Sequence, residues 1–216
     1  MTDSLPALPP DALARVHQLL AGDGRVLLGL AGAPGSGKST LALALQQAFA
    51  ELAVVVPMDG FHLANAELAR LGRAGRKGAH DTFDSAGYVA LLERLRRQRA
   101  DETVYAPEFR REIEEPVAGA IAVPPQARLV ITEGNYLLLD DGHWARVAAL
   151  LDQRWYVEAD PALRLERLAG RHRQFGRSQA AALDWIARTD EPNARLIETT
   201  RARADHVFRW DAPAAG

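Results

Sequence analysis

The sequence predicts an α/β fold in which helices cover the faces of a parallel sheet. Short apolar runs of strand length alternate along the chain with stretches of helical periodicity. The first apolar run also enters a glycine-rich loop, and a helical pattern follows that loop directly. We therefore expect three layers, with a helix layer on each side of the sheet.

Five apolar runs predict the strands of this sheet. They are Val26 to Leu30, Ala53 to Val56, Leu129 to Thr132, Trp155 to Val157 and Val207 to Arg209. Helical patterns lie between most of these runs. We expect helices over Asp11 to Leu20 and Ser39 to Ala50, along the stripe Tyr88, Leu91, Leu92 and Leu95, and from starts at Asp160-Pro161 and Glu191-Pro192.

Length, charge and cysteine content limit the classes of function. The chain has 216 residues, which suits one domain over residues 1–216. Its 26 basic and 28 acidic residues give a formal charge of -2, so we expect no nucleic-acid partner and no anionic membrane surface. The absence of cysteine excludes disulfides and thiol nucleophiles. No apolar run is long enough to span a bilayer, so we expect a cytoplasmic protein.

The glycine-rich loop carries the most specific signal in the chain. Gly32-Ala33-Pro34-Gly35-Ser36-Gly37-Lys38-Ser39 fits the pattern G-x-x-x-x-G-K-[ST] at every constrained position. In that pattern backbone N–H groups converge on a phosphate, the lysine reaches the β- and γ-phosphates, and the hydroxyl holds Mg²⁺. The loop therefore predicts a P-loop nucleotide site formed by Gly32 to Ser39 and the adjacent Thr40.

Two acidic residues follow predicted strands, where the ligand crevice of such a sheet lies. Asp59 stands in Met58-Asp59-Gly60-Phe61-His62, and Glu133 in Thr132-Glu133-Gly134-Asn135-Tyr136. Phosphoryl transfer to an alcohol needs a carboxylate that accepts the hydroxyl proton and a metal that gathers the phosphates. We assign Asp59 as the base and Glu133, with Ser39, to the Mg²⁺ shell. A cap of the next turn is the alternative for either acid. The glycine after each acid permits a tight turn and close approach to a ligand.

Arginines follow the Asp160-Pro161 start at helical spacing. Arg164, Arg167 and Arg171 share one face, while Arg173 and Arg177 flank Gly176. Such a pattern predicts a mobile lid near residues 171–180 that brings positive charge onto the transferring phosphoryl group, with Arg171 as the catalytic cation. A solvated helix face paired with Glu166 is the alternative.

The proline-rich segment 101–125 predicts an irregular insertion, with short strands, beside the ligand site.

These segments together resemble the P-loop kinase family that contains uridine kinase, type I pantothenate kinase and phosphoribulokinase. The resemblance covers about Val26 to Phe208 and rests on the order of five motifs. They are the loop Gly32 to Ser39, Asp59 to His62, Arg76-Lys77-Gly78 with Asp81-Thr82-Phe83-Asp84, Glu133 to Tyr136, and the arginine lid.

The resemblance implies a five-stranded parallel sheet, ATP with Mg²⁺, an acceptor hydroxyl near Asp59, and pairing of two copies. It also implies an acceptor side made of His62, Asp81, Tyr105, Phe109 and Arg111. Arg110 departs from the pattern, because relatives often have an acidic residue there. The adjacent arginines favour a carboxylate or phosphate on the substrate, or they pair with Glu112, Glu114 and Glu115.

The residues thus predict an ATP-dependent kinase that acts on a hydroxyl of a small metabolite. A nucleoside, a pantothenate-like compound and a sugar all remain open as acceptors. The alternative function is a regulatory ATPase or nucleotide switch that acts on a protein partner. The absence of an N-K-x-D segment argues against a guanine-specific switch.

Overall fold

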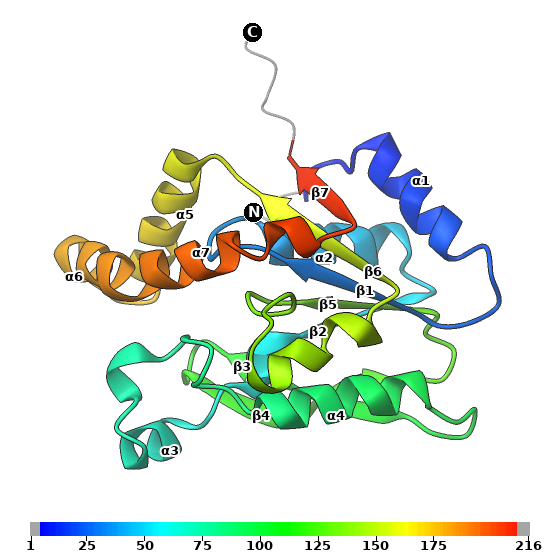
Figure 1. Ribbon diagram of the computed structural model, residues 1–216, viewed down its shortest axis with the longest axis horizontal. Coiled ribbons are helices and arrows are strands. Elements are labelled where there is room, and N and C mark those ends of the chain that lie inside the picture. Colours follow the sequence, from blue (N-terminus) through cyan, green and yellow to red (C-terminus); the bar gives the residue numbers. More distant parts are fainter. Residues whose placement is uncertain (1–4, 211–216) are drawn as a thin grey trace, which may run out of the picture.

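The structure is a computed structural model that describes residues 5–210 (Figure 1). Five strands form one sheet in the order β2-β5-β1-β6-β7, and every neighbouring pair is parallel. The strands are β1 (Val26–Ala31), β2 (Ala53–Pro57), β5 (Leu129–Glu133), β6 (Gln153–Glu158) and β7 (His206–Arg209). The predicted α/β class and the five-stranded parallel sheet are confirmed.

Helices cover both faces of the sheet because side chains along each strand alternate between the faces. Leu28 and Leu30 of β1 point into a cluster with α1 (Pro10–Leu19) and α2 (Lys38–Ala48). Leu27 and Ala31 point into a second cluster with α4 (Ser85–Arg96). All six residues of β1 are buried, which explains the unbroken apolar run.

Shorter helical segments lie between the main elements. The fold also contains α3 (Asn65–Arg70) and 3₁₀ turns at Met58–Phe61, Ala74–Arg76, Gly142–Arg146, Ala148–Leu150 and Arg201–Arg203. Among residues 5–210, no helix combines the length and the apolar character needed to cross a bilayer.

The predicted irregular insertion is a regular antiparallel hairpin of β3 (Val104–Arg110) and β4 (Glu115–Val123). These strands have seven and nine residues, so they are longer than the short strands expected. The prolines concealed this regularity. Pro107 lies at the register shift between Ala106 and Glu108, where a missing N–H leaves the ladder intact.

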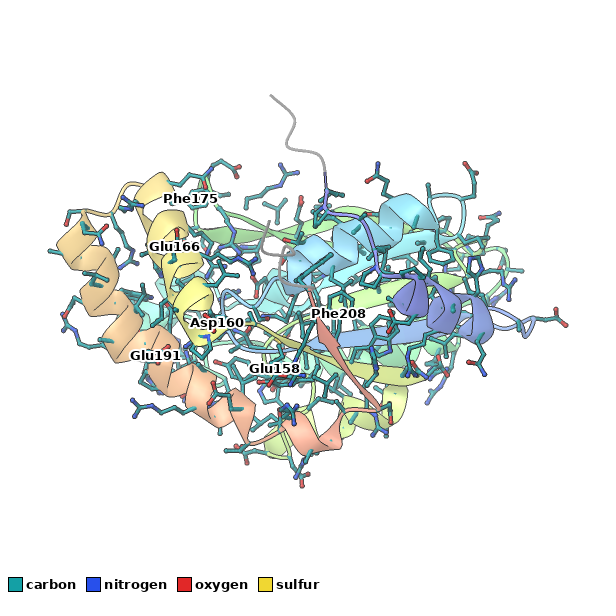
Figure 2. All side chains as sticks on the ribbon, turned by 90° about the horizontal axis from the view of Figure 1, so that it is seen from above. Glu158, Asp160, Glu166, Phe175, Glu191 and Phe208 are labelled. Carbon is teal, nitrogen blue, oxygen red and sulfur yellow. The ribbon has the colours of Figure 1, made fainter. Side chains whose placement is uncertain are left out.

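The last helices form an arm beyond the carboxyl ends of the strands, at the left of Figure 1. The arm contains α5 (Pro161–Gln174), α6 (Gln179–Trp185), a π-helical turn (Ile186–Asp190) and α7 (Glu191–Glu198). Figure 2 shows α5, with Glu166 and Phe175, alongside the α6–α7 segment that carries Glu191.

The start predicted at Glu191-Pro192 coincides with the start of α7, but the helical path begins earlier, at Gln179. Pro192 cannot donate a backbone hydrogen bond, and its ring would crowd a normal α-turn before it. The wider π turn accommodates the proline without a break in the helix.

Candidate active site

The loop Gly32 to Ser39 joins the carboxyl end of β1 to α2, as the motif requires. Gly37 caps α2 with φ of 93°, a conformation that favours glycine. A Cβ on Gly32 would lie 2.5 Å from the backbone oxygen of Val157, so the loop packs directly on β6. The loop therefore curls tightly at the amino end of α2, where its amide groups can surround a phosphate.

Lys38 is buried at the centre of this loop. Its Nζ donates a hydrogen bond to the backbone oxygen of Ala33, 3.0 Å away. Burial lowers the pKa of Lys38 to about 8, although the carboxylates of Glu133 and Asp59 oppose that shift. The charged ammonium is therefore poorly compensated in the ligand-free protein, and a bound polyphosphate would supply the missing negative charge.

We expect nucleotide affinity to fall as pH rises above about 8. Below that pH, Lys38 already carries its proton. Above it, the free protein has lost the proton that the phosphates require, so binding must take up a proton. Affinity should then fall by up to about tenfold per pH unit. Calorimetric titration with a non-hydrolysable ATP analogue from pH 7 to 9.5 measures this slope. An equal slope in the Lys38→Met variant would assign the proton to another group.

Glu133 ends β5, an inner strand of the sheet, where its Cα pairs with Pro57 of β2 on one side and Leu30 of β1 on the other. Its Oε1 accepts a hydrogen bond of 2.8 Å from the Ser39 hydroxyl. Burial, reinforced by the Asp59 carboxylate, raises the pKa of Glu133. A cation at this point would favour the ionised carboxylate.

The Ser39–Glu133 pair fits the Mg²⁺ expected from the motif. Mg²⁺ prefers oxygen ligands and usually takes one or two protein groups together with substrate phosphates and water. The pair offers a hydroxyl and a carboxylate beside the phosphate loop. Residues 5–210 contain no cluster of three acidic or histidine side chains that would form an all-protein metal cage. The donor set therefore suits a metal that arrives with the nucleotide.

Asp59 lies in the 3₁₀ turn that follows β2, the strand next to β5. Its Oδ2 is 3.4 Å from Nη2 of Arg111, and its backbone oxygen accepts a hydrogen bond of 2.8 Å from Nδ1 of His62. Asp59 influences both Lys38 and Glu133 electrostatically. The two strand-end carboxylates therefore share one charged centre with the lysine.

His62 is a neutral, packed side chain. Burial lowers its pKa, although Asp59 opposes the shift. Its ring lies 4.0 Å from the Phe83 ring and 4.6 Å from the Phe109 ring, measured between centroids. Because Nδ1 donates to a backbone oxygen, the lone pair of Nε2 is free to accept a hydrogen bond from a ligand hydroxyl.

The glycines after the two acids have a different role from the one expected. A Cβ on Gly60 would clash with the backbone oxygen of Pro107, and one on Gly134 would lie 2.5 Å from Cβ of Met58. Neither glycine has a positive φ. They allow close packing of protein segments, which positions the acids, rather than close approach of a ligand.

A cavity of about 470 Å³ opens beside Asp59, between the hairpin and the helical arm. Four of the predicted acceptor-side and catalytic residues line it together with Asp59: His62, Phe109, Arg111 and Arg171. Its other lining residues include Asn65, Lys77, Phe83, Glu114, Asn135, His172, Arg177, Trp185, Asp190 and Asn193. The hairpin thus contributes to the site, as the sequence predicted.

Two predicted acceptor residues lie elsewhere. Tyr105 is 58% exposed, because strand alternation buries Val104 and Ala106 and turns Tyr105 outward. Asp81 is held by a bidentate contact with Arg76, whose Nη1 is 2.8 Å from Oδ1. Neither residue lines the cavity, so the cavity gives no support to these two assignments, which stay predictions.

Comparison with known proteins identifies the class to which this arrangement belongs. The model of the phosphoribulokinase / uridine kinase family matches residues 27–211. The chain belongs to this family. Its members are kinases, so the protein is a phosphotransferase that acts on a hydroxyl of a small molecule.

Individual relatives agree with the family. A proposed uridine kinase of Schizosaccharomyces pombe is 36% identical over 206 residues, which are 90% of this chain and 87% of the relative. An ATP-dependent kinase-like protein of Aspergillus versicolor is 40% identical over 152 residues, covering 67% and 88%. The crystal structure of a proposed fructose transport system kinase from Silicibacter sp. TM1040 has a TM-score of 0.83 and 40% identity, covering 94% and 100%.

The arginines on α5 of this family member separate into different environments. Arg164 is buried, forms an ion pair with Glu191 and donates to the backbone oxygen of Pro34, 3.4 Å away. Arg171 lines the cavity, whereas Arg173 is exposed and does not. Burial lowers the pKa of Arg171, and Arg111 adds to that effect. The alternative, a solvated face paired with Glu166, has no such ion pair among residues 5–210. The role of Arg171 as a phosphoryl-binding cation stays a prediction, which its place in the cavity lining supports.

Sequence reasoning missed the contribution of the π turn to the cavity. The turn places Asp190 so that its Oδ2 lies 2.8 Å from Nε2 of His172 on α5. Both side chains are largely buried and line the cavity. The Glu191-Pro192 pair was the available signal, since proline within a continuous helix often accompanies a local widening.

Proposed function

We propose that this kinase transfers the γ-phosphoryl group of ATP to a hydroxyl of a small metabolite bound in the 470 Å³ cavity. The position of Asp59 is the observation that carries the proposal. Asp59 lines the cavity and also acts electrostatically on Lys38 and Glu133 of the nucleotide side. A carboxylate shared by both sides suits a base that deprotonates the acceptor as the phosphoryl group arrives.

The phosphates of the nucleotide would lie on Gly32 to Thr40, and its nucleobase would lie beside α2. A smaller cavity of about 290 Å³ supports that placement, because it is lined by Gly37, Thr40, Arg167 and Trp210. The planar guanidinium of Arg167 and the indole of Trp210 can stack on a nucleobase. This smaller cavity therefore offers a place for the nucleobase next to the predicted phosphate-binding residues.

Each protein group has a defined task in the proposed transfer. Asp59 accepts the hydroxyl proton, and Lys38 holds the β- and γ-phosphates. Arg171 balances charge on the transferring group, since it lines the cavity without a carboxylate partner among the described residues. Ser39 and Glu133 would hold Mg²⁺, which neutralises phosphate charge when bound.

The names of the relatives do not agree on an acceptor, since one names uridine and another a fructose transport system. The proposal is tested by ADP release with ATP and Mg²⁺ against a panel of nucleosides, sugars and hydroxy acids. We expect release that rises only with certain acceptors and a phosphorylated product that mass spectrometry detects. Hydrolysis stimulated by a protein partner, without such a product, would support the regulatory ATPase instead. The single domain over residues 1–216 and the pairing of two copies stay predictions.

A further inference from the structure

The acceptor cavity contains more positive charge than its carboxylates neutralise. Its lining includes four cations, Lys77, Arg111, Arg171 and Arg177. It includes three acidic residues, Asp59, Glu114 and Asp190. Asp59 is paired with Arg111, and Asp190 with His172. Within residues 5–210, no carboxylate oxygen lies within 4.0 Å of the nitrogens of the other three cations.

Lys77 is one of these unneutralised cations. Its Nζ donates to Oδ1 of Asn65 at 2.6 Å and to the backbone oxygen of Glu114, so its hydrogen-bond partners are neutral. Nζ also lies 5.1 Å from the centre of the Phe109 ring. Burial lowers the pKa of Lys77, and the more distant carboxylates of Glu115 and Glu114 offset this only in part. An anion in the cavity would stabilise the charged form.

Arg177 is the second of these unneutralised cations. Its guanidinium stacks on Trp185, with Cζ 4.0 Å from the ring centre. Stacking fixes the plane of the guanidinium through its face and leaves the N–H groups at its edge available for an oxyanion. The backbone N–H of Arg177 donates to the oxygen of His172, which anchors the turn after α5. Arg177 is therefore oriented without a charged partner.

We propose that the acceptor carries an anionic group, a carboxylate or a phosphate, which Lys77 and Arg177 bind while its hydroxyl faces Asp59. This inference rests on the proposed function and specifies its substrate class. Arg171 is assigned to the transferring phosphoryl group, so Lys77 and Arg177 are the cations left for the acceptor. A neutral nucleoside or sugar would leave both cations beside the ligand without a counter-ion.

Matched pairs of compounds test the inference because each pair differs in one charged group. The carboxylate pairs are glycerate with glycerol, gluconate with glucitol, and pantothenate with panthenol. The phosphate pair is ribulose 5-phosphate with ribulose. Thermal shift with a non-hydrolysable ATP analogue measures binding, and coupled ADP release measures turnover. We expect at least one anionic compound to raise the melting temperature more than its partner and to have at least about tenfold higher kcat/KM.

The variants Lys77→Met and Arg177→Met separate recognition from structure. Each should raise KM for the anionic compound about tenfold or more, with a smaller effect on kcat and none on its neutral partner. Arg195→Met is the matched control, because Arg195 is an exposed arginine of α7, in the same arm, that does not line the cavity. It should change neither constant. Equal losses for charged and neutral compounds would mean that Lys77 only ties Asn65 to the hairpin.

The outcomes distinguish this inference from the proposed function. Preferred turnover of neutral compounds, or melting temperatures that no anionic compound raises above its partner, would overturn the inference and leave the kinase reaction intact. Selective binding of an anionic compound without any phosphorylated product would support anion recognition and overturn the proposed transfer. Preference for the phosphate pair over all carboxylate pairs, or the reverse, identifies the anionic group.

Discussion

Asp59→Asn should abolish phosphoryl transfer while it preserves nucleotide binding. A general base contributes about 10²–10⁴-fold, and asparagine cannot accept the hydroxyl proton. The substituted amide would retain the size of the side chain and a hydrogen-bonding oxygen for Arg111, so the 3.4 Å contact is the main interaction weakened. Single-turnover measurements of product, together with calorimetric nucleotide titration, separate the two effects.

Asp140→Asn provides a matched control for the change of charge. Asp140 is an exposed aspartate whose Oδ2 lies 2.7 Å from Arg203, away from the cavity lining. This variant should retain transfer at the wild-type rate. Transfer that survives at more than about a tenth of that rate in Asp59→Asn would remove Asp59 as the base.

Lys38→Met should lower kcat by about 10²–10³-fold, the typical loss when one charged or hydrogen-bonding group at a transition state is removed. The lysine is buried within the phosphate loop, where its ammonium can reach the β- and γ-phosphates. The stability of the fold should not fall and should rise at pH 7. Burial of the charge lowers the pKa of Lys38, so the charged form opposes folding at pH 7, and an apolar side chain removes that cost.

Melting temperature and nucleotide affinity together check this prediction. Loss of activity with an unchanged or higher melting temperature assigns Lys38 to binding and catalysis. Loss of activity with a marked drop in melting temperature would make it a structural residue. Lys77, the only other lysine of the chain, provides the comparison, because Lys77→Met should leave nucleotide affinity unchanged.

The nucleotide side could be predicted from sequence because its parts are local. The phosphate loop is contiguous, and Asp59 and Glu133 end strands whose apolar runs are unambiguous. Parallel strands bring such ends together at one edge of the sheet. The structure places both carboxylates beside Lys38, as this reasoning requires.

The acceptor side could be predicted only in part, because it depends on which way side chains turn. Tyr105 faces solvent as a result of strand alternation in a segment whose prolines suggested irregular structure. Asp81 is held by an arginine five residues earlier, which spacing alone does not reveal. Asp190 enters the cavity through a π turn, and the Glu191-Pro192 pair that accompanies this turn is equally typical of an ordinary helix start.

The helix α5 contacts both candidate ligand sites. A Cβ on Gly35 would lie 2.8 Å from the backbone oxygen of Arg164, so the first turns of α5 rest on the phosphate loop, while Arg171 and His172 near its end line the acceptor cavity. A ligand that shifts one end of α5 would therefore also displace the residues at its other end. Occupation of either site should therefore alter affinity at the other, and the two substrates should bind cooperatively rather than independently.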